Sequence, residues 1–410
     1  MLSEGIPMFL RFSIGLLLLI KSTVSFAFSV EGVIRLSSVS NNAQPSFFDK
    51  GNGIFRSDGN DLLLSQAILS TQVDVGKSLV LHSVANAYSD GDKQLGLTQA
   101  YLEYRPLSPG VFRWSSRAGL FYPRLSVENT DVGWLANHFI TSSALNSWIG
   151  EELRVPGLEL SLHRSGRKAK SPWSFRFDLG AYKGNDTTGT LLTWRGFAIH
   201  DRQTLHHERV EFAPLPSVIS PDYFNAPSWT EPFTEVDGKV GFYVGAQAQY
   251  VRKLDIRYFI YDNRANPLKV NEQRLYAWHT KFHSLATRYL MTPNLTLSLH
   301  LMDGATEMGS RLVYADFRAA YGAFSYTQGA HKYSVRLDLF DVKEDDLVPK
   351  DYNDSHGHAL TINWTYRLSN NWQVTAEGIY TKHRFENRPS LAIADKQRDY
   401  QGQLAMTYRF

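Results

Sequence analysis

The 410-residue chain contains no cysteine, which excludes both a disulfide framework and a thiolate metal site. After residue 20 it also has no apolar run that approaches the roughly 20 residues of a membrane-spanning helix. Neither sign of charge dominates, because 43 basic residues stand against 40 acidic ones. The balance gives no argument for nucleic acid as a partner, and we predict that the chain binds none.

The first 27 residues have the features of a secretory signal peptide. Arg11 supplies a positive charge, residues 14–20 form an apolar segment too short to span a membrane, and residues 25–27 resemble a cleavage site. Either Met1 or Met8 could be the start. We therefore predict a signal peptide at 1–27.

The remaining residues, 28–410, show no linker and no second composition regime, so we expect a single domain. Aromatic residues make up 13% of the chain, which suits the two aromatic girdles of a membrane barrel. The mean hydropathy is nonetheless slightly polar, at −0.29. A barrel explains both observations, because each residue that faces lipid is followed by one that faces the interior.

Alternation of apolar and polar residues recurs along the chain, in runs that suit a tilted strand crossing a bilayer in about 9–11 residues. One face of each run is predicted to contact lipid. The residues assigned to it are Trp173, Phe175, Phe177 and Leu179; Phe242, Val244 and Ala246; Leu297, Leu299 and Leu301; Val313, Ala315, Phe317, Ala319 and Tyr321; Tyr333, Val335, Leu337 and Leu339; and Leu360, Ile362, Trp364 and Tyr366.

The last eleven residues show the same pattern most clearly. Tyr400, Gly402, Leu404, Met406, Tyr408 and Phe410 share one face, and Gln401, Gln403, Thr407 and Arg409 share the other. A final strand that ends on an outward aromatic residue resembles the signal by which outer-membrane proteins reach their assembly machinery. We assign that role to Tyr408 and Phe410.

The links between the runs alternate between short and long. The short ones, at 74–77, 106–110, 252–253, 292–294, 328–331 and 369–371, are rich in turn-forming residues; the long ones lie at 123–153, 185–238, 263–273 and 343–357. Short turns at one rim and long loops at the other are typical of bacterial outer-membrane barrels. The length predicts 16 or 18 antiparallel strands, with 189–213 as the ambiguous stretch. We favour 16, which leaves an aqueous lumen.

Two segments resemble the phosphate-selective porin family. Residues 117–124, Arg-Ala-Gly-Leu-Phe-Tyr-Pro-Arg, resemble the Gly-aromatic-Pro corner of that family, and a long loop then ends at 149–158, Ile-Gly-Glu-Glu-Leu-Arg-Val-Pro-Gly-Leu. The resemblance implies a general or anion-leaning diffusion channel with a long segment folded into the pore. It does not transfer phosphate selectivity, because 123–153 carries Glu128, Asp131, Glu151 and Glu152 beside its basic residues.

The alternation also selects candidate pore-lining residues. We assign to the lumen Arg113, Arg117, Arg176, Arg257, Arg318, Arg336 and Arg367, together with Asp178, Asp255, Asp316 and Asp338. Arginines in a narrow pore would concentrate anions. Alternatively, Arg-x-Asp pairs such as Arg176 with Asp178 tie neighbouring strands and only fill the wall. Arg113 and Arg117 share their strand with no carboxylate, so we expect them to be unneutralised.

Segment 123–153 is the candidate constriction loop, with Arg124, Glu128 and Asp131 as its charged residues. We expect Glu128 and Asp131 to lie across the narrowest part of the pore from Arg113 and Arg117. Such opposed charges would produce the transverse field of a general porin.

These features predict a porin of the bacterial outer membrane that passes small hydrophilic solutes, with a mild anion preference. The alternatives are a receptor or adhesin acting through its long loops, or an outer-membrane enzyme; no spacing of nucleophile and base supports the last. Expected partners are outer-membrane lipids, lipopolysaccharide, the barrel assembly machinery and a homotrimer. We predict no cofactor and no metal, although His206, His207, His356 and His358 are competent ligands.

Overall fold

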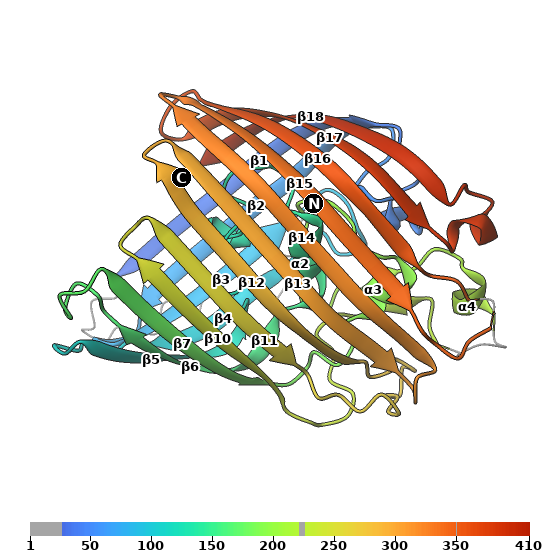
Figure 1. The fold of residues 1–410 in the computed structure, drawn as a ribbon, viewed down its shortest axis with the longest axis horizontal. Helices are drawn as coiled ribbons and strands as arrows, with labels where there is room; N and C mark the ends of the chain where they lie inside the picture. Colours follow the sequence, from blue (N-terminus) through green and yellow to red (C-terminus); the bar gives the residue numbers. More distant parts are fainter. Residues whose placement is uncertain (1–26, 221–225, 350) are drawn as a thin grey trace, which may run out of the picture.

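The computed structural model describes residues 27–220, 226–349 and 351–410, so the predicted signal peptide lies outside the described residues except for Ala27. The chain forms a closed antiparallel barrel of 16 strands, in the order β1-β18-β17-β16-β15-β14-β13-β12-β11-β10-β7-β6-β5-β4-β3-β2 (Figure 1). Every connection within the barrel joins neighbours. The predicted fold class and the favoured strand number are confirmed.

The strands at the two ends of the chain, β1, β2 and β12 to β18, are longer than those between them. Their bounds are β1 (Phe28–Asn41), β2 (Asn60–Asp74), β3 (Leu79–Ala87), β4 (Leu95–Tyr104), β5 (Phe112–Phe121), β6 (Val155–Arg164), β7 (Trp173–Tyr182), β10 (Gly241–Tyr250), β11 (Leu254–Asp262), β12 (His279–Thr292), β13 (Leu295–Met308), β14 (Val313–Gln328), β15 (His331–Glu344), β16 (Ser355–Arg367), β17 (Trp372–Phe385) and β18 (Lys396–Arg409).

The ambiguous stretch 189–213 adds no strand to the barrel. It contains the short helix α3 (Thr190–Trp194), and β8 (Val210–Glu211) pairs with β9 (Trp229–Thr230) in a separate two-stranded sheet. The other helices are α2 (Ala144–Glu152), α4 (Pro216–Ile219), η1 (Phe47–Asp49), η2 (Val132–Trp134) and η3 (Arg388–Leu391). Among the described residues, no helix is long and apolar enough to cross a membrane.

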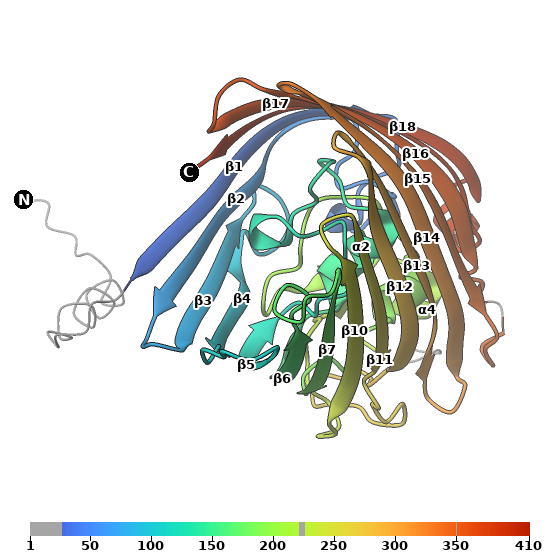
Figure 2. The same cartoon turned by 60° about the vertical axis from the view of Figure 1, so that its left-hand side comes forward.

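The two rims of the barrel differ, as the sequence predicts. At one rim, which we call the short-turn rim, the strands are joined by residues 75–78, 105–111, 165–172, 251–253, 293–294, 329–330 and 368–371. At the opposite rim, the long-loop rim, the links include 42–59, 122–154, 183–240, 263–278 and 345–354. Residues 123–153 of the second of these links and residues 186–205 of the third turn into the barrel (Figure 2).

The wall has an apolar outer face over most of its height. Leu297, Leu299 and Leu301 point outward, while Ser298 and His300 between them are buried on the inside. The same assignment holds for the predicted lipid-facing residues of β7, β10, β15, β16 and β18. Strand β14 is the exception.

On β14 the prediction is wrong by one residue. Val313, Ala315, Phe317, Ala319 and Tyr321 point into the barrel and are buried, whereas the charged residues between them point outward. Arg318 therefore does not line the lumen. It pairs on the outer surface with Asp303 of β13, at 2.7 Å, and both side chains are about 70% exposed.

The barrel closes where β1 meets β18. The amide of Gly32 donates to the carbonyl of Phe410 (2.9 Å), and the amide of Phe410 donates back to Gly32 (3.2 Å). The Phe410 ring lies directly over Gly32, where an added Cβ would stand 2.1 Å from a ring carbon. Tyr408 stacks beside it with ring centroids 5.9 Å apart. The two predicted assembly residues thus lie at the closing seam, and their role in assembly stays a prediction.

Candidate functional site

The candidate constriction loop, 123–153, runs inside the barrel and carries α2 (Figure 2). Carboxylates on the inner wall hold its backbone. Glu377 of β17 accepts a hydrogen bond from the amide of Ile140 at 2.7 Å, and Asp338 of β15 accepts one from Ala144 at 3.1 Å. Because both bonds join loop amides to side chains of the wall, they fix the path of the loop against the wall.

Arg336 of β15, which is 0% exposed, joins the same loop to the wall. Its guanidinium lies 2.8 Å from the carboxylate of Asp338 on its own strand and 2.8 Å from Glu128 in the loop. It also donates to the carbonyl oxygens of Thr141 (2.7 Å) and Ser142 (3.0 Å). A buried guanidinium surrounded by acceptors in this way depends on all of them, because the loss of one partner leaves a charge unpaired in a dry site.

A second segment, 186–205, packs against α2. Glu151 at the end of α2 lies 2.5 Å from Arg195 and 2.9 Å from the ring of His200. Burial acts to raise the pKa of Glu151, but the charge of Arg195 and the contact with His200 outweigh it and lower the pKa to about 2. The two segments are therefore joined through an ionised carboxylate, and together we call 123–153 and 186–205 the inner plug.

Glu152, the next residue, is buried without a cation. Its carboxylate accepts from the indole N–H of Trp148 (2.5 Å) and from the amides of Gly189 (3.0 Å) and Leu191 (3.1 Å) at the start of α3. Burial raises the pKa of Glu152 to about 7, although these hydrogen bonds oppose the shift. The junction of the two segments thus contains one carboxylate that is firmly charged and one that titrates near neutral pH.

An apolar core fills the lumen between the inner plug and the wall. Trp148 of α2 is fully buried, with its ring centroid 6.4 Å from Phe197, 5.7 Å from Phe282 and 5.1 Å from Phe317. This core explains the inward face of β14, because Phe317 meets the plug and not water. The gap lined by Ser147 and residues 201–203 has no room for a water molecule. The expectation of an aqueous lumen therefore fails where the inner plug packs against the wall.

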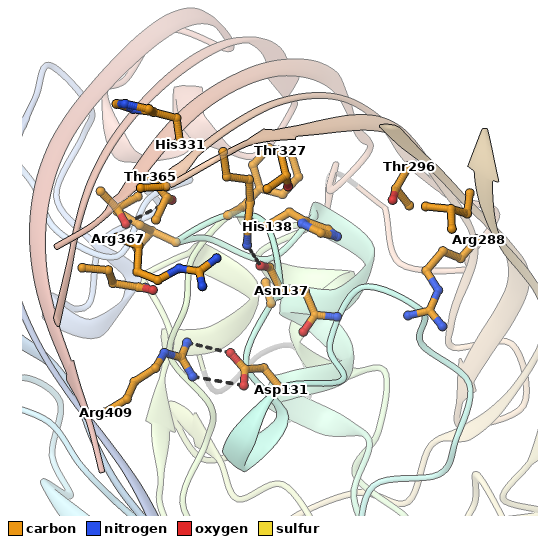
Figure 3. A pocket seen from close by; sticks show the side chains of 18 of the residues that line it. Asp131, Asn137, His138, Arg288, Thr296, Thr327, His331, Thr365, Arg367 and Arg409 are labelled. Carbon is orange, nitrogen blue, oxygen red and sulfur yellow. Dashed lines mark hydrogen bonds and ion pairs between the residues drawn. The ribbon is translucent and has the colours of Figure 1, made fainter. Parts of the chain in front are cut away.

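An open space remains on the side of the short-turn rim. This cavity, which we call the vestibule, has a volume of about 860 Å³ and is bounded by the loop residues 136–140 and by the ends of the strands (Figure 3). Seven cationic side chains line it, against two carboxylates, Asp131 and Asp255. The cations are Arg35, Arg252, Lys253, Arg288, Lys332, Arg367 and Arg409.

Four of these cations have no carboxylate within ion-pair distance among the residues that the structure describes: Arg252, Lys253, Lys332 and Arg367. The ammonium of Lys332 donates to the carbonyl of Asn137 at 2.9 Å, so it stands against the loop. The other three arginines are neutralised, as Arg409 is by Asp131 at 2.7 Å. A concave space with an excess of unpaired positive charge concentrates anions.

Of the arginines predicted to line the pore, only Arg367 lines the vestibule, together with the predicted lumen carboxylate Asp255. Arg113 points inward on β5 opposite His163, outside the vestibule lining. Arg176 pairs with Asp178 (2.7 Å) and Arg257 with Asp255 (3.0 Å), the wall-filling arrangement that the Arg-x-Asp spacing allowed. Arg336 holds the loop.

The expectation that Arg117 is unneutralised is wrong. Two of its N–H groups donate to Glu159 of the neighbouring strand, each at 2.8 Å, and Arg124 also pairs with that carboxylate. Glu128 and Asp131 do not oppose Arg113 and Arg117 either. They bind Arg336 and Arg409, on the other side of the barrel.

Sequence reasoning missed Lys332, Arg35 and Arg409 as vestibule residues. The alternation placed Arg409 on the inner face but gave no sign that a cavity lies there. Glu152 was counted only as a charge of the loop, and Glu377 was not considered. The local sequence does not distinguish a carboxylate that accepts hydrogen bonds from a loop backbone from one that is exposed to solvent.

One group of carboxylates has the spacing of a metal site. Oxygen atoms of Asp186, Glu235 and Asp237 lie within 4.8 Å of one another at the long-loop rim. Backbone amides already bind them: Asp186 accepts from Val236 (2.7 Å) and Glu235 from Gly184 (2.9 Å). Burial raises the pKa of Asp186 to about 7, in part opposed by those amides. The prediction of no metal and no cofactor stays a prediction.

No family of known sequences matches the chain, and neither does any curated protein sequence. Solved structures do match. The outer membrane channel DcaP of Acinetobacter baumannii is 10% identical with a TM-score of 0.58, over 95% of this chain and 99% of that one. An anion-selective porin from Comamonas acidovorans is 12% identical with a TM-score of 0.54, over 94% and 100%. OmpT of Vibrio cholerae is 10% identical with a TM-score of 0.54, over 95% and 99%.

At these identities the likeness concerns the fold, which is that of outer-membrane barrels. It agrees with the predicted location in the bacterial outer membrane. The narrower resemblance to phosphate-selective porins has no counterpart in these matches and stays a prediction.

Proposed function

We propose that the chain is a porin-type channel of the outer membrane that passes small hydrophilic solutes and favours anions. The observation that carries the anion preference is the vestibule, with seven cations, four of them unpaired, around about 860 Å³. The Comamonas acidovorans protein of similar fold is an anion-selective porin, which supports the proposal without deciding it.

The orientation follows from the rims. In bacterial outer-membrane barrels the short turns face the periplasm and the long loops face the outside, so the vestibule opens to the periplasm. A signal peptide at 1–27 fits export across the inner membrane. A homotrimer is also part of the proposal; one solved structure of similar fold, OmpT of Vibrio cholerae, is described in a trimer form.

The filled half of the lumen adds a condition to this function. A solute that enters the vestibule meets residues 136–140 of the loop and then the apolar core around Trp148. We infer that the conformation described is closed, and that conduction requires the inner plug to move. The constriction predicted for 123–153 is thus a movable barrier in this proposal, and Arg336 is the residue that ties it most directly to the wall.

The test is conduction across a planar bilayer under a gradient of potassium chloride. We expect discrete unitary steps and a reversal potential on the side of chloride. The double variant Lys332→Gln, Arg367→Gln removes two unpaired vestibule cations and should move the reversal potential towards potassium. The matched control is Arg176→Gln, which removes an inner-wall arginine that is not part of the vestibule.

Two results would contradict the proposal. An unchanged reversal potential in the double variant would mean that the vestibule does not select ions. A correctly folded barrel that never conducts, even after deletion of 126–148, would favour the receptor or adhesin alternative.

A further inference from the structure

A belt of charged side chains points outward from the barrel near the long-loop rim. On β13, β14 and β15 the belt alternates in sign, since Asp303 lies directly opposite Arg318, and Arg318 directly opposite Asp341. Arg318 is already paired with Asp303, at 2.7 Å. It needs no partner from outside the chain.

On β16, β17 and β18 the belt is basic. His358 lies directly opposite Lys382, and Lys382 directly opposite Arg398, so three basic side chains form one row across three strands. All three are exposed and point outward, and none has a carboxylate within ion-pair distance among the described residues. We call them the basic row. Figure 1 shows the three strands side by side.

The adjacent row towards the rim is basic as well, with His356 opposite Arg384 and Arg384 opposite Lys396. Here Arg384 is neutralised by Glu386 at 3.0 Å and Asp395 at 2.8 Å. The basic row has no such neighbours. Like charges placed directly opposite on adjacent strands destabilise a sheet, so an arrangement of this kind calls for an anion from outside.

The height of the basic row on the wall indicates which anion. Two residues further from the rim, the outward rings of Tyr380 and Tyr400 lie opposite each other with centroids 5.1 Å apart. Beyond them the outer face is apolar, with Ile362 and Leu404 exposed. Tyrosines mark the boundary between hydrocarbon and headgroups, so the basic row stands at the level of the lipid headgroups.

A groove on the outer surface meets the same row. It has a volume of about 490 Å³ and its lining is mainly apolar, with Leu301, Ala320 and Leu339. The groove also reaches His358 of the basic row, and Asp303, Arg318 and Asp341 line it as well. The small side chain of Ala320 lets the groove form between the leucines of β13 and β15. A mainly apolar groove that adjoins the basic row suits one chain of an amphiphile whose charged head lies on the row.

We propose that the basic row and this groove form a binding site for a phosphorylated lipid of the outer leaflet. The lipid phosphate would lie between Lys382 and Arg398, with His358 at its edge, and an acyl chain would occupy the groove. Arg and Lys are the side chains that bind phosphate oxygens through charge-assisted hydrogen bonds. The site is independent of conduction, because every residue in it faces away from the lumen.

The test measures binding of diphosphoryl lipid A to the detergent-solubilised full barrel by native mass spectrometry. Lys382→Gln, Arg398→Gln should weaken binding by about 30-fold, the loss expected for two cations at an anionic membrane surface. The control is Lys281→Gln, Lys343→Gln, which removes the same charge from outward lysines that lie opposite Asp262 and Asp316. That variant should bind like the wild type.

Heat-modified electrophoretic mobility would verify that both double variants form closed barrels. Equal losses in the two double variants would overturn the proposal, because binding would then follow net charge and not the site. Binding of a lipid with the same acyl chains but no phosphate as tightly as diphosphoryl lipid A would also overturn it. So would displacement of the lipid by inorganic phosphate, which would assign the site to a free anion.

Discussion

Replacement of Arg336 by Gln should release the inner plug from the wall. In the native structure the guanidinium binds Asp338 and Glu128 at 2.8 Å each and the carbonyl oxygens of Thr141 and Ser142 at 2.7 and 3.0 Å. Without it, two carboxylates stay buried with their main cation removed. Breaking a buried ion pair by removing one partner costs roughly 3–5 kcal/mol.

The wall itself has hydrogen-bonded strands on both sides of β15, so we expect this cost to be relieved by movement of the loop and not by unfolding of the barrel. A shift of roughly 3–5 kcal/mol between closed and open states would raise the ratio of open to closed channels about 150- to 5,000-fold. Single-channel recording should show rare openings in the wild type and frequent or continuous openings in Arg336→Gln.

The control for this experiment is Arg176→Gln, which also breaks an Arg-x-Asp pair on the inner wall but touches no part of 123–153. It should leave the open probability close to that of the wild type. If Arg336→Gln folds to a heat-modifiable barrel and its open probability is unchanged, the plug is not held by Arg336 and the reasoning is refuted. Equal opening in both variants would show a general weakening of the wall.

Three further predictions concern the wall, the seam and the plug. Leu299→Arg should cost roughly 2–4 kcal/mol of folding free energy in lipid, because it places a charge on the outer face. Thr296 lines the vestibule, so Thr296→Arg should be tolerated. Urea titration in lipid vesicles would compare the two variants, and equal costs would show that the inner and outer faces are misassigned. Phe410→Ser should lower the amount of barrel assembled in the outer membrane, which membrane fractionation would measure. A normal amount of the variant in the outer membrane would contradict the role of Phe410 as an assembly signal. Burial raises the pKa of Glu152 above its unfolded value to about 7, so the protonated side chain is the form that fits the closed plug. Its contribution to the stability of the plug is complete below about pH 4.5 and is lost as the pH rises through 7. The open probability should therefore rise between pH 5 and pH 8, and Glu152→Gln should remove that dependence; a pH profile identical in wild type and variant would contradict it.

The sequence carried most of the information about the wall. A two-residue period is a local property, so the alternation at 295–301 or 400–410 assigns strand and face without knowledge of the neighbours. Short links rich in turn residues then separate the two rims. These signals explain why the strand number and the arrangement of the rims could be predicted.

The face of β14 could not be predicted in the same way. Its inward residues, such as Phe317, are as apolar as residues that face lipid, because they pack against Trp148 and not against water. The rule that apolar residues face outward assumes a lumen filled with water. Where the inner plug fills the lumen, apolar residues can also face inward. Asp316 and Arg318 point outward because β14 is near the headgroup level at this end, where charge is tolerated.

The pairing of charges was also beyond the sequence. Arg117 and Glu159 are 42 positions apart, and Arg336 and Glu128 are 208 apart. Each partnership depends on which strands become neighbours and on how a loop enters the barrel. The prediction that Arg117 is unneutralised considers only carboxylates on its own strand, whereas its partner Glu159 lies on the neighbouring strand.

The seam between β1 and β18 has a consequence for the order of events in folding. The residues that it joins, such as Gly32 and Phe410, belong to the first and last strands of the barrel, so the cylinder cannot close until β18 has been synthesised. Until then the sheet has two open edges with unpaired amides and carbonyls, which are prone to pair with other chains. An intermediate in which the other strands have paired before β18 joins would therefore need protection at both edges. Once the ring of Phe410 packs over Gly32, the two edges are paired with each other and need no further protection.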